Sequence, residues 1–318
     1  MVKYCAQMKK ENILLVKHGA LGDFVMSLSL MSAIVKRHSG ARFTLITQAF
    51  LADLAKRTGF FDEIVIDNRG YGVRDWWRII KKTLADRPFD RIYDLQSNNR
   101  TLVRYAPLAR FATRHPMRWG KRVKGGFDFL CTPAKLPFTF KRCTVEHVDM
   151  DAPRIDISFI HGDGRNFDLL PEKYALVIPG CSAGSPQKRW PPERYREISL
   201  WLGSLGLKSV VIGTRAEESE IEAVCRDNPH AVNFMGKSAI SDLPDMASRS
   251  VIVIGNDTGP SHMAWSSGAQ TVMCFTEYDS RALPRVPNVT GLVAPKITDI
   301  PVEDVKEAVA ARLGKSAF

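Results

Sequence analysis

Residues 12–23, N-I-L-L-V-K-H-G-A-L-G-D, join an apolar run to a glycine turn and the start of a helix. The run Ile13–Val16 contains no polar residue, as expected of a strand that is buried on both faces of a sheet. Apolar residues then recur at helical spacing from Asp23 to about His38. A strand, a turn and a helix in this order predict the first β–α unit of a parallel sheet.

The same alternation extends along most of the chain. It breaks over residues 113–173, which are rich in Pro, Gly and charged residues, and then restarts. Further strands are predicted at residues 43–46, 64–67, 91–95, 175–178, 210–213, 232–234, 251–255 and 271–275, with a terminal helix at about 302–313. We therefore predict an α/β fold with two Rossmann-like domains, residues 1–165 and 166–318, facing each other across a cleft.

The composition is that of a globular protein, with 45% hydrophobic and 25% charged residues. No run of 18 apolar residues is present, and the first eleven residues carry charges where a signal peptide needs an apolar core. We therefore expect a cytoplasmic protein. The six cysteines are scattered and form no CxxC pair, so we expect free thiols and no bound metal.

The positive charge is concentrated in the first half. Residues 1–150 hold 27 Lys+Arg and 13 Asp+Glu, a net charge of +14, whereas the remainder holds 18 and 21, a net charge of −3. This asymmetry predicts an anionic partner for the first domain, for which nucleic acid, a phosphorylated glycolipid and an anionic membrane surface all qualify. No nucleic-acid-binding motif is present, so a specific nucleic-acid partner is not expected.

Asp23 lies at a helix start, after the first predicted strand. A carboxylate there can act as a general base at the edge where doubly wound folds bind ligands. It can equally be an N-cap residue or a complement to the positive end of the helix dipole. The spacing alone leaves these interpretations open.

Three further segments of the second half follow strands. The loop at residues 180–191 carries Lys188, which can neutralise a phosphate, and Ser182 and Ser185, whose hydroxyls can add hydrogen bonds. The turn at residues 255–262 brings Asp257, Thr258, Gly259 and His262 to a helix start, which is a geometry that suits a diphosphate. Glu217 follows another strand, where an acidic residue can bind a ribose or simply complement a helix dipole.

Together these segments resemble the heptosyltransferase family of glycosyltransferases, which has the two-domain GT-B fold. The matching stretches are LGDFVMSLSLM, IPGCSAGSPQKRWPPERY, GTRAEE and GNDTGPSHMAWSSGA, in the order of the family. The resemblance implies that Asp23 is the catalytic base and that Lys188 contacts the donor phosphates. It also implies that Glu217 holds the ribose and that Asp257, Thr258, Gly259 and His262 surround the sugar and diphosphate.

The resemblance further implies an ADP-heptose donor, a lipopolysaccharide inner-core acceptor, inversion of configuration and no metal or other cofactor. The basic residues between 100 and 124 are then expected to face a phosphorylated glycolipid acceptor or the anionic inner membrane; they include Arg100, Arg104, Arg118, Lys121 and Arg122. Two departures stand out: Ser29 replaces a usual Pro, and residues 275–280 read FTEYDS where FGPTDP is common. A transferase or epimerase for another nucleotide-sugar therefore remains an alternative.

Overall fold

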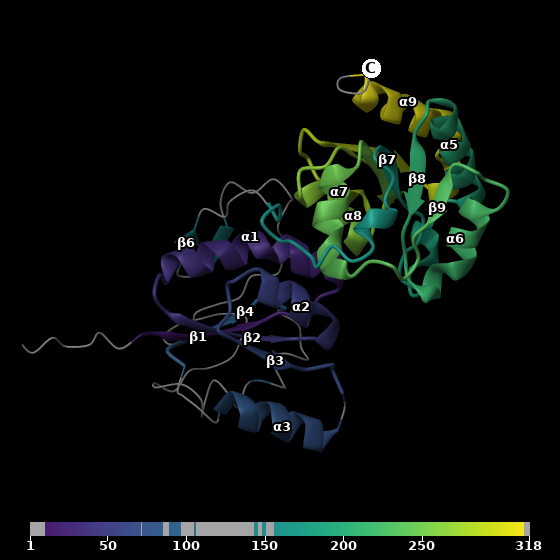
Figure 1. Cartoon of the computed structure of the whole chain (residues 1–318). Coiled ribbons are helices and arrows are strands. Elements are labelled where there is room, and N and C mark those ends of the chain that lie inside the picture. Colours follow the sequence, from purple (N-terminus) through teal and green to yellow (C-terminus); the bar gives the residue numbers. More distant parts are fainter. Residues whose placement is uncertain are drawn as a thin grey trace, which may run out of the picture. The chain divides into compact units, whose positions relative to one another are not determined.

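The computed structural model describes residues 10–70, 72–84, 89–96, 105, 143–145, 148–150 and 156–314. They divide into two compact units (Figure 1). The described residues up to 150 belong to the first unit, and those from 156 onward belong to the second.

The first unit is built on a four-stranded parallel sheet of order β3-β2-β1-β4. Its strands and helices are β1 (Asn12–Val16), α1 (Leu21–Arg37), β2 (Arg42–Thr47), α2 (Ala49–Arg57), β3 (Glu63–Ile66), α3 (Val73–Leu84) and β4 (Arg91–Asp94). Every residue of β1 is buried, as the apolar run predicted for a central strand. Helices α1 and α3 cover opposite faces of this sheet (Figure 1). An antiparallel pair, β5 (Cys143–Val145) and β6 (Val148–Met150), also belongs to this unit.

The second unit contains a six-stranded parallel sheet of order β12-β11-β10-β7-β8-β9. Its longer elements are β7 (Tyr174–Ile178), α5 (Pro192–Ser204), β8 (Lys208–Val211), α6 (Glu218–Cys225), β9 (Ala231–Asn233), α7 (Leu243–Arg249), β10 (Ile252–Asn256), α8 (Gly259–Ser266), β11 (Thr271–Thr276), β12 (Val289–Ala294) and α9 (Val302–Leu313). Helices α5, α6 and α9 contribute apolar side chains to one core with β7, β8, β10 and β11. The α/β fold with two parallel sheets is thus confirmed.

Two predictions about element boundaries differ from the structure. Residues 156–165 were assigned to the first domain but belong to the second unit. The backbone explains this, because Ile157 N donates to Ser266 O and the amides of Gly162 and Gly164 donate to carboxylates on or just before α7. The prediction also ended the sheet at β11, whereas β12 adds a sixth strand. Its sequence VTGLVA contains a glycine and is only half-buried, so it lacks the apolar run of a central strand.

Candidate active site

Each sheet has one topological switch point, where successive strands stop being added on one side of the first strand and continue on its other side. In the first sheet this switch lies between β1 and β4, and in the second it lies between β7 and β10. Ligands of doubly wound folds bind outside the carboxyl ends of the strands at such switches, where two neighbouring loops diverge. Asp23 lies in the first turn of α1, which follows β1, whereas the segments after β7 and β10 carry Lys188 and Asp257.

Lys188 lies between two carboxylates at the switch of the second sheet. Its Nζ contacts Asp257 Oδ2 at 2.5 Å and Asp279 Oδ1 at 3.0 Å. Both carboxylates are at least nine-tenths buried, and Lys188 retains 23% of its side-chain exposure. Burial alone would lower the pKa of Lys188, but the two carboxylates outweigh it and raise that pKa. Lys188 is therefore a cation with one face open to solvent.

The buried side chain of His262 orients Asp257 through a hydrogen bond. The indole of Trp265, which can only donate, donates to His262 Nδ1 at 2.9 Å. The proton of the neutral imidazole must then lie on Nε2, which donates to Asp257 Oδ1 at 2.9 Å. Burial would raise the pKa of Asp257, but His262 and Lys188 together lower it. Since both ring nitrogens of His262 are engaged, the side chain positions Asp257.

Glu217 lies at the carboxyl end of β8, beside β7. Its Oε2 accepts hydrogen bonds from the amide and the hydroxyl of Thr214, closing a capping box. Its Oε1 accepts no hydrogen bond among the described residues. The close approach of Glu217 requires glycine at position 180, because a Cβ there would lie 2.5 Å from Glu217 Cγ. Oε2 of Glu217 thus stabilises the turn, whereas Oε1 is available to accept hydrogen bonds from hydroxyl groups of a ligand.

The remaining predicted donor-site groups lie in the loop after β7 and at the start of α8. Thr258 is the N-cap residue of α8 and makes no side-chain capping bond; its hydroxyl contacts Ser261 Oγ at 3.2 Å. Gly259 is the first residue of α8, so its amide has no partner within the helix. Ser182 is exposed and Ser185 half-buried, and neither hydroxyl has a partner within the described part of the chain. The loop after β7 and the start of α8 therefore offer hydroxyl and amide groups that can donate hydrogen bonds.

Two residues of this region were not predicted from the sequence. Asp279 lies in the segment FTEYDS, which looked only like a departure from the family pattern, yet it accepts from Thr276 Oγ1 at 2.7 Å and contacts Lys188. Asn256 accepts from the Trp190 amide and the Tyr195 hydroxyl at 3.0 and 2.9 Å, and donates to Pro179 O. Asn256 thereby ties the loop after β7 to the end of β10. Its place at the end of a buried strand was the available signal.

Asp23 lies in the first turn of α1 and is exposed. The helix begins at Leu21, and Ala20 is the N-cap residue. The N-cap interpretation of Asp23 is therefore wrong, because the residue lies inside the helix. Interaction with the helix dipole remains, and it leaves the carboxylate in solvent, where a substrate hydroxyl can reach it.

A buried polar network fixes the turn that precedes Asp23. His18 Nε2 contacts the Tyr105 hydroxyl at 2.9 Å and Asp67 Oδ2 at 3.4 Å, and Tyr105 also donates to Asp67. Gln96 Oε1 accepts from the amides of His18 and Gly19. Burial lowers the pKa of His18, whereas the pKa of Asp67 is lowered because hydrogen bonds outweigh its own burial. Burial thus favours the neutral form of His18, and the hydrogen bonds favour the ionised form of Asp67.

We expect Tyr105→Phe to destabilise the protein by about 1–3 kcal/mol, because the buried Asp67 loses a hydroxyl donor while the ring that stacks on His18 is kept. Urea denaturation measures this change. The exposed Tyr278 offers a matched control, and Tyr278→Phe should change the free energy of unfolding by less than about 0.5 kcal/mol. Equal effects of the two substitutions would contradict the role of the network.

The predicted acceptor residues Arg100, Arg104, Arg118, Lys121 and Arg122 lie outside the described residues. Within the described ranges, no group of three or more His, Cys, Asp or Glu side chains could hold a metal ion. None of the helices in those ranges is long and apolar enough to cross a membrane.

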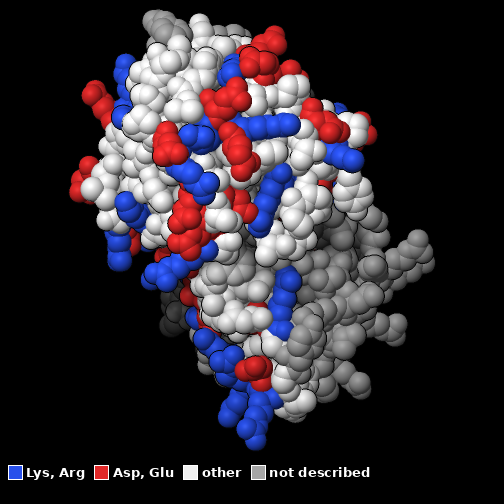
Figure 2. Space-filling view, turned by 90° about the vertical axis from the view of Figure 1, so that its right-hand side faces the viewer, with Lys and Arg blue, Asp and Glu red and all other residues white. Residues whose placement is uncertain are grey.

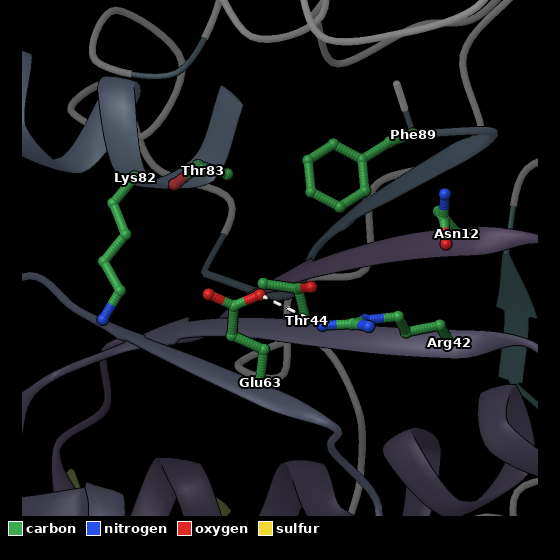
Figure 3. Close-up of a pocket in the computed structure, with 7 residues that line it drawn as sticks. All are labelled: Asn12, Arg42, Thr44, Glu63, Lys82, Thr83 and Phe89. Carbon is green, nitrogen blue, oxygen red and sulfur yellow. Dashed lines mark ion pairs between the residues drawn. The ribbon is translucent and has the colours of Figure 1, made fainter. Parts of the chain in front are cut away.

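A pocket of the first unit lies away from these switches. Asn12, Arg42 and Glu63, the first residues of β1, β2 and β3, line it, so it opens at the amino ends of the strands (Figure 3). Arg42 and Glu63 pair with each other across it at 3.6 Å. Because the carboxyl ends carry the candidate catalytic groups, this pocket is not part of the candidate site.

Two units, each with a parallel sheet and polar side chains after its switch-point strands, are the architecture of the GT-B fold. The chain belongs to glycosyltransferase family 9 (heptosyltransferase), whose family model matches residues 77–296. The resemblance seen in the sequence motifs is thus confirmed. No curated protein sequence matches the chain.

Solved structures extend this similarity over almost the whole chain. The E. coli ADP-heptose LPS heptosyltransferase II matches with a TM-score of 0.75 and 16% identity, over 96% of this chain and 100% of that chain. A glycosyltransferase family 9 protein from Veillonella parvula matches with a TM-score of 0.74 and 17% identity, over 96% and 98%. The E. coli heptosyltransferase WaaC with ADP gives a TM-score of 0.67 and 16% identity, over 96% and 99%. At these identities the similarity establishes the fold.

Proposed function

We propose that this glycosyltransferase transfers a heptose from ADP-heptose to a phosphorylated inner-core acceptor of lipopolysaccharide, with inversion at the anomeric carbon. The observation that carries the proposal is the order of polar side chains along the second sheet. Strands β8, β7, β10 and β11 are consecutive neighbours, and the loops that follow them carry Glu217, Lys188, Asp257 and Asp279 respectively.

The order of these four side chains across the sheet matches the order of ribose, diphosphate and sugar in a nucleotide-sugar. Oε1 of Glu217 accepts ribose hydroxyls at the β8 end. Lys188, with the amides at the start of α8, receives the diphosphate at the switch point. Asp257 and Asp279, which can only accept hydrogen bonds when ionised, receive sugar hydroxyls on the β10 and β11 side.

Asp23 supplies the base for the transfer. It removes the proton from an acceptor hydroxyl, whose oxygen bonds to the anomeric carbon as the bond from that carbon to the diphosphate breaks. The departing diphosphate takes the bonding electrons, and Lys188 and the α8 amides stabilise the charge that develops. Because these groups are cationic or donate hydrogen bonds, we expect the transfer to proceed without a divalent ion or other cofactor.

The acceptor is assigned to the first unit, because the excess of positive charge lies in residues 1–150. We propose that the basic residues between 100 and 124 meet its phosphates at the cytoplasmic face of the inner membrane. The first unit would thus form the acceptor domain and the second unit, which includes residues 156–165, the donor domain.

Solved structures with this fold include both a heptosyltransferase that binds ADP and a UDP-sugar epimerase. WaaC has been solved with ADP and with ADP-2-deoxy-2-fluoro heptose, which supports an adenine nucleotide here. A UDP-N-acetylglucosamine 2-epimerase also matches, with a TM-score of 0.58 and 11% identity over 97% of this chain and 88% of that chain. The alternative is therefore a GT-B transferase or epimerase with another nucleotide-sugar.

A thermal-shift screen with ADP, UDP, GDP and CMP tests the donor. Of the four nucleotides, we expect only ADP to raise Tm, because a ligand that binds the native state stabilises it against unfolding. Lys188→Ala should remove this increase in Tm. Lys296→Ala, an exposed lysine in the same unit, serves as the control and should keep it. A shift with UDP or GDP in place of ADP would support the alternative donor and contradict ADP-heptose.

A further inference from the structure

Helix α3 presents an exposed face that combines basic and aromatic side chains. Val73 and Trp77 retain 69% and 58% of their exposure, and lie one helical turn apart. Arg74, Arg78 and Lys81 are exposed next to them. In Figure 2, Lys and Arg side chains gather at the lower end of the first unit, which is where Figure 1 places α3.

The opposite face of α3 explains why Trp77 points outward. Ile79 and Ile80 are 2–3% exposed and belong to the core of the first unit, and Trp76 packs against that core. Trp76 and Trp77 meet edge to face, with ring centroids 5.0 Å apart. The helix is therefore fixed by one apolar face, and the Trp77 side chain is displayed on the other.

We propose that this face of α3 docks on an anionic phospholipid surface. The helix bears four basic residues and one acidic residue, Asp75, which gives a net charge of +3. Lys and Arg attract anionic headgroups, whereas an indole with a basic border suits the boundary between headgroups and acyl chains. The paired exposed Val73 and Trp77 favour a lipid surface over nucleic acid, since a phosphate backbone alone needs no apolar contact. This inference does not depend on the identity of the donor.

Vesicle sedimentation tests the docking face. We expect wild-type protein to bind vesicles containing phosphatidylglycerol but not phosphatidylcholine alone, and Arg74→Gln/Arg78→Gln/Lys81→Gln to lower the partition coefficient at least about tenfold. The control Lys173→Gln/Arg226→Gln/Lys296→Gln removes the same charge from exposed positions of the second unit. Equal losses in the two triple variants would overturn the proposal, because they would show attraction by net charge alone. Binding by the α3 variant at the wild-type level would also overturn it.

A second measurement locates Trp77 directly. With lipids that carry a quencher near the headgroup, part of the tryptophan fluorescence should be quenched on binding, and Trp77→Phe should clearly reduce that quenching while the protein still sediments. Circular dichroism confirms that each variant is folded. Unchanged quenching in Trp77→Phe, or displacement of the protein from vesicles by duplex DNA through the same α3 residues, would contradict a lipid-docking role.

Discussion

Asp23→Asn should lower kcat for sugar transfer by about 100- to 10,000-fold, since asparagine keeps the size of the side chain but cannot accept the proton of the acceptor hydroxyl. The exposed position of Asp23 in the first turn of α1 makes this variant informative. Replacement removes only a favourable helix-dipole interaction of about 0.3–1 kcal/mol, so the protein should remain folded.

Steady-state transfer of the sugar from the donor identified by thermal shift measures the loss. Asp53→Asn gives a matched control, because Asp53 is also exposed on a helix of the first unit, where it pairs with Arg57 one helical turn away. It should leave kcat within about a factor of two. The nucleotide-induced rise in Tm should be the same in wild type and Asp23→Asn, because Asp23 is assigned to the acceptor. If Asp23→Asn retains kcat within threefold, the base lies elsewhere.

The strands of the second unit show why some parts of the structure were predictable. β7 is a continuous apolar run and β10 begins with one at Ile252–Ile254, and every residue of both strands is buried, so the sequence signals them without tertiary information. Among the described strands, β12 lies at the edge of the sheet beside β11, and its Gly291 lies against Leu283. Its stability comes from that pairing, and the sequence of the segment alone contains no comparable signal.

The residues of the candidate site likewise include some that the sequence predicts and some that it does not. Lys188, Glu217 and Asp257 lie in turns whose sequences are specific enough to be identified. Asp279 could not be found in this way, because only the order of β11 and β10 in the sheet brings it to Lys188, 91 residues earlier in the chain. His18 and Asp67 likewise meet because β1 and β3 end at the same edge of one sheet. Contacts of this kind depend on the topology and not on local spacing.

Lys188→Met should lower kcat/KM by about 100- to 1,000-fold, because it removes the cation assigned to the departing diphosphate and leaves the α8 amides to act alone. It should also destabilise the protein by about 1–3 kcal/mol, since Asp257 and Asp279 would remain buried without their shared ammonium group. Neutralising one of the two carboxylates as well should restore part of the lost stability. In Lys188→Met/Asp279→Asn we expect the free energy of unfolding to rise by about 1–2 kcal/mol over the single variant, while transfer stays low.

The pH dependence separates this electrostatic explanation from a packing effect. The pKa of Asp257 is lowered, so its stabilisation is fully present above the unfolded value near 3.9 and is lost as the pH falls through the lower folded value. The pKa of Lys188 is raised, so its stabilisation is fully present below about 10.4 and is lost as the pH rises through the higher folded value. The difference in Tm between wild type and Lys188→Met should therefore be constant from about pH 5 to pH 9 and shrink outside that range. A difference that persists unchanged at pH 2, in protein that still unfolds cooperatively, would show that Lys188 acts through packing and would remove the basis for its role at the diphosphate.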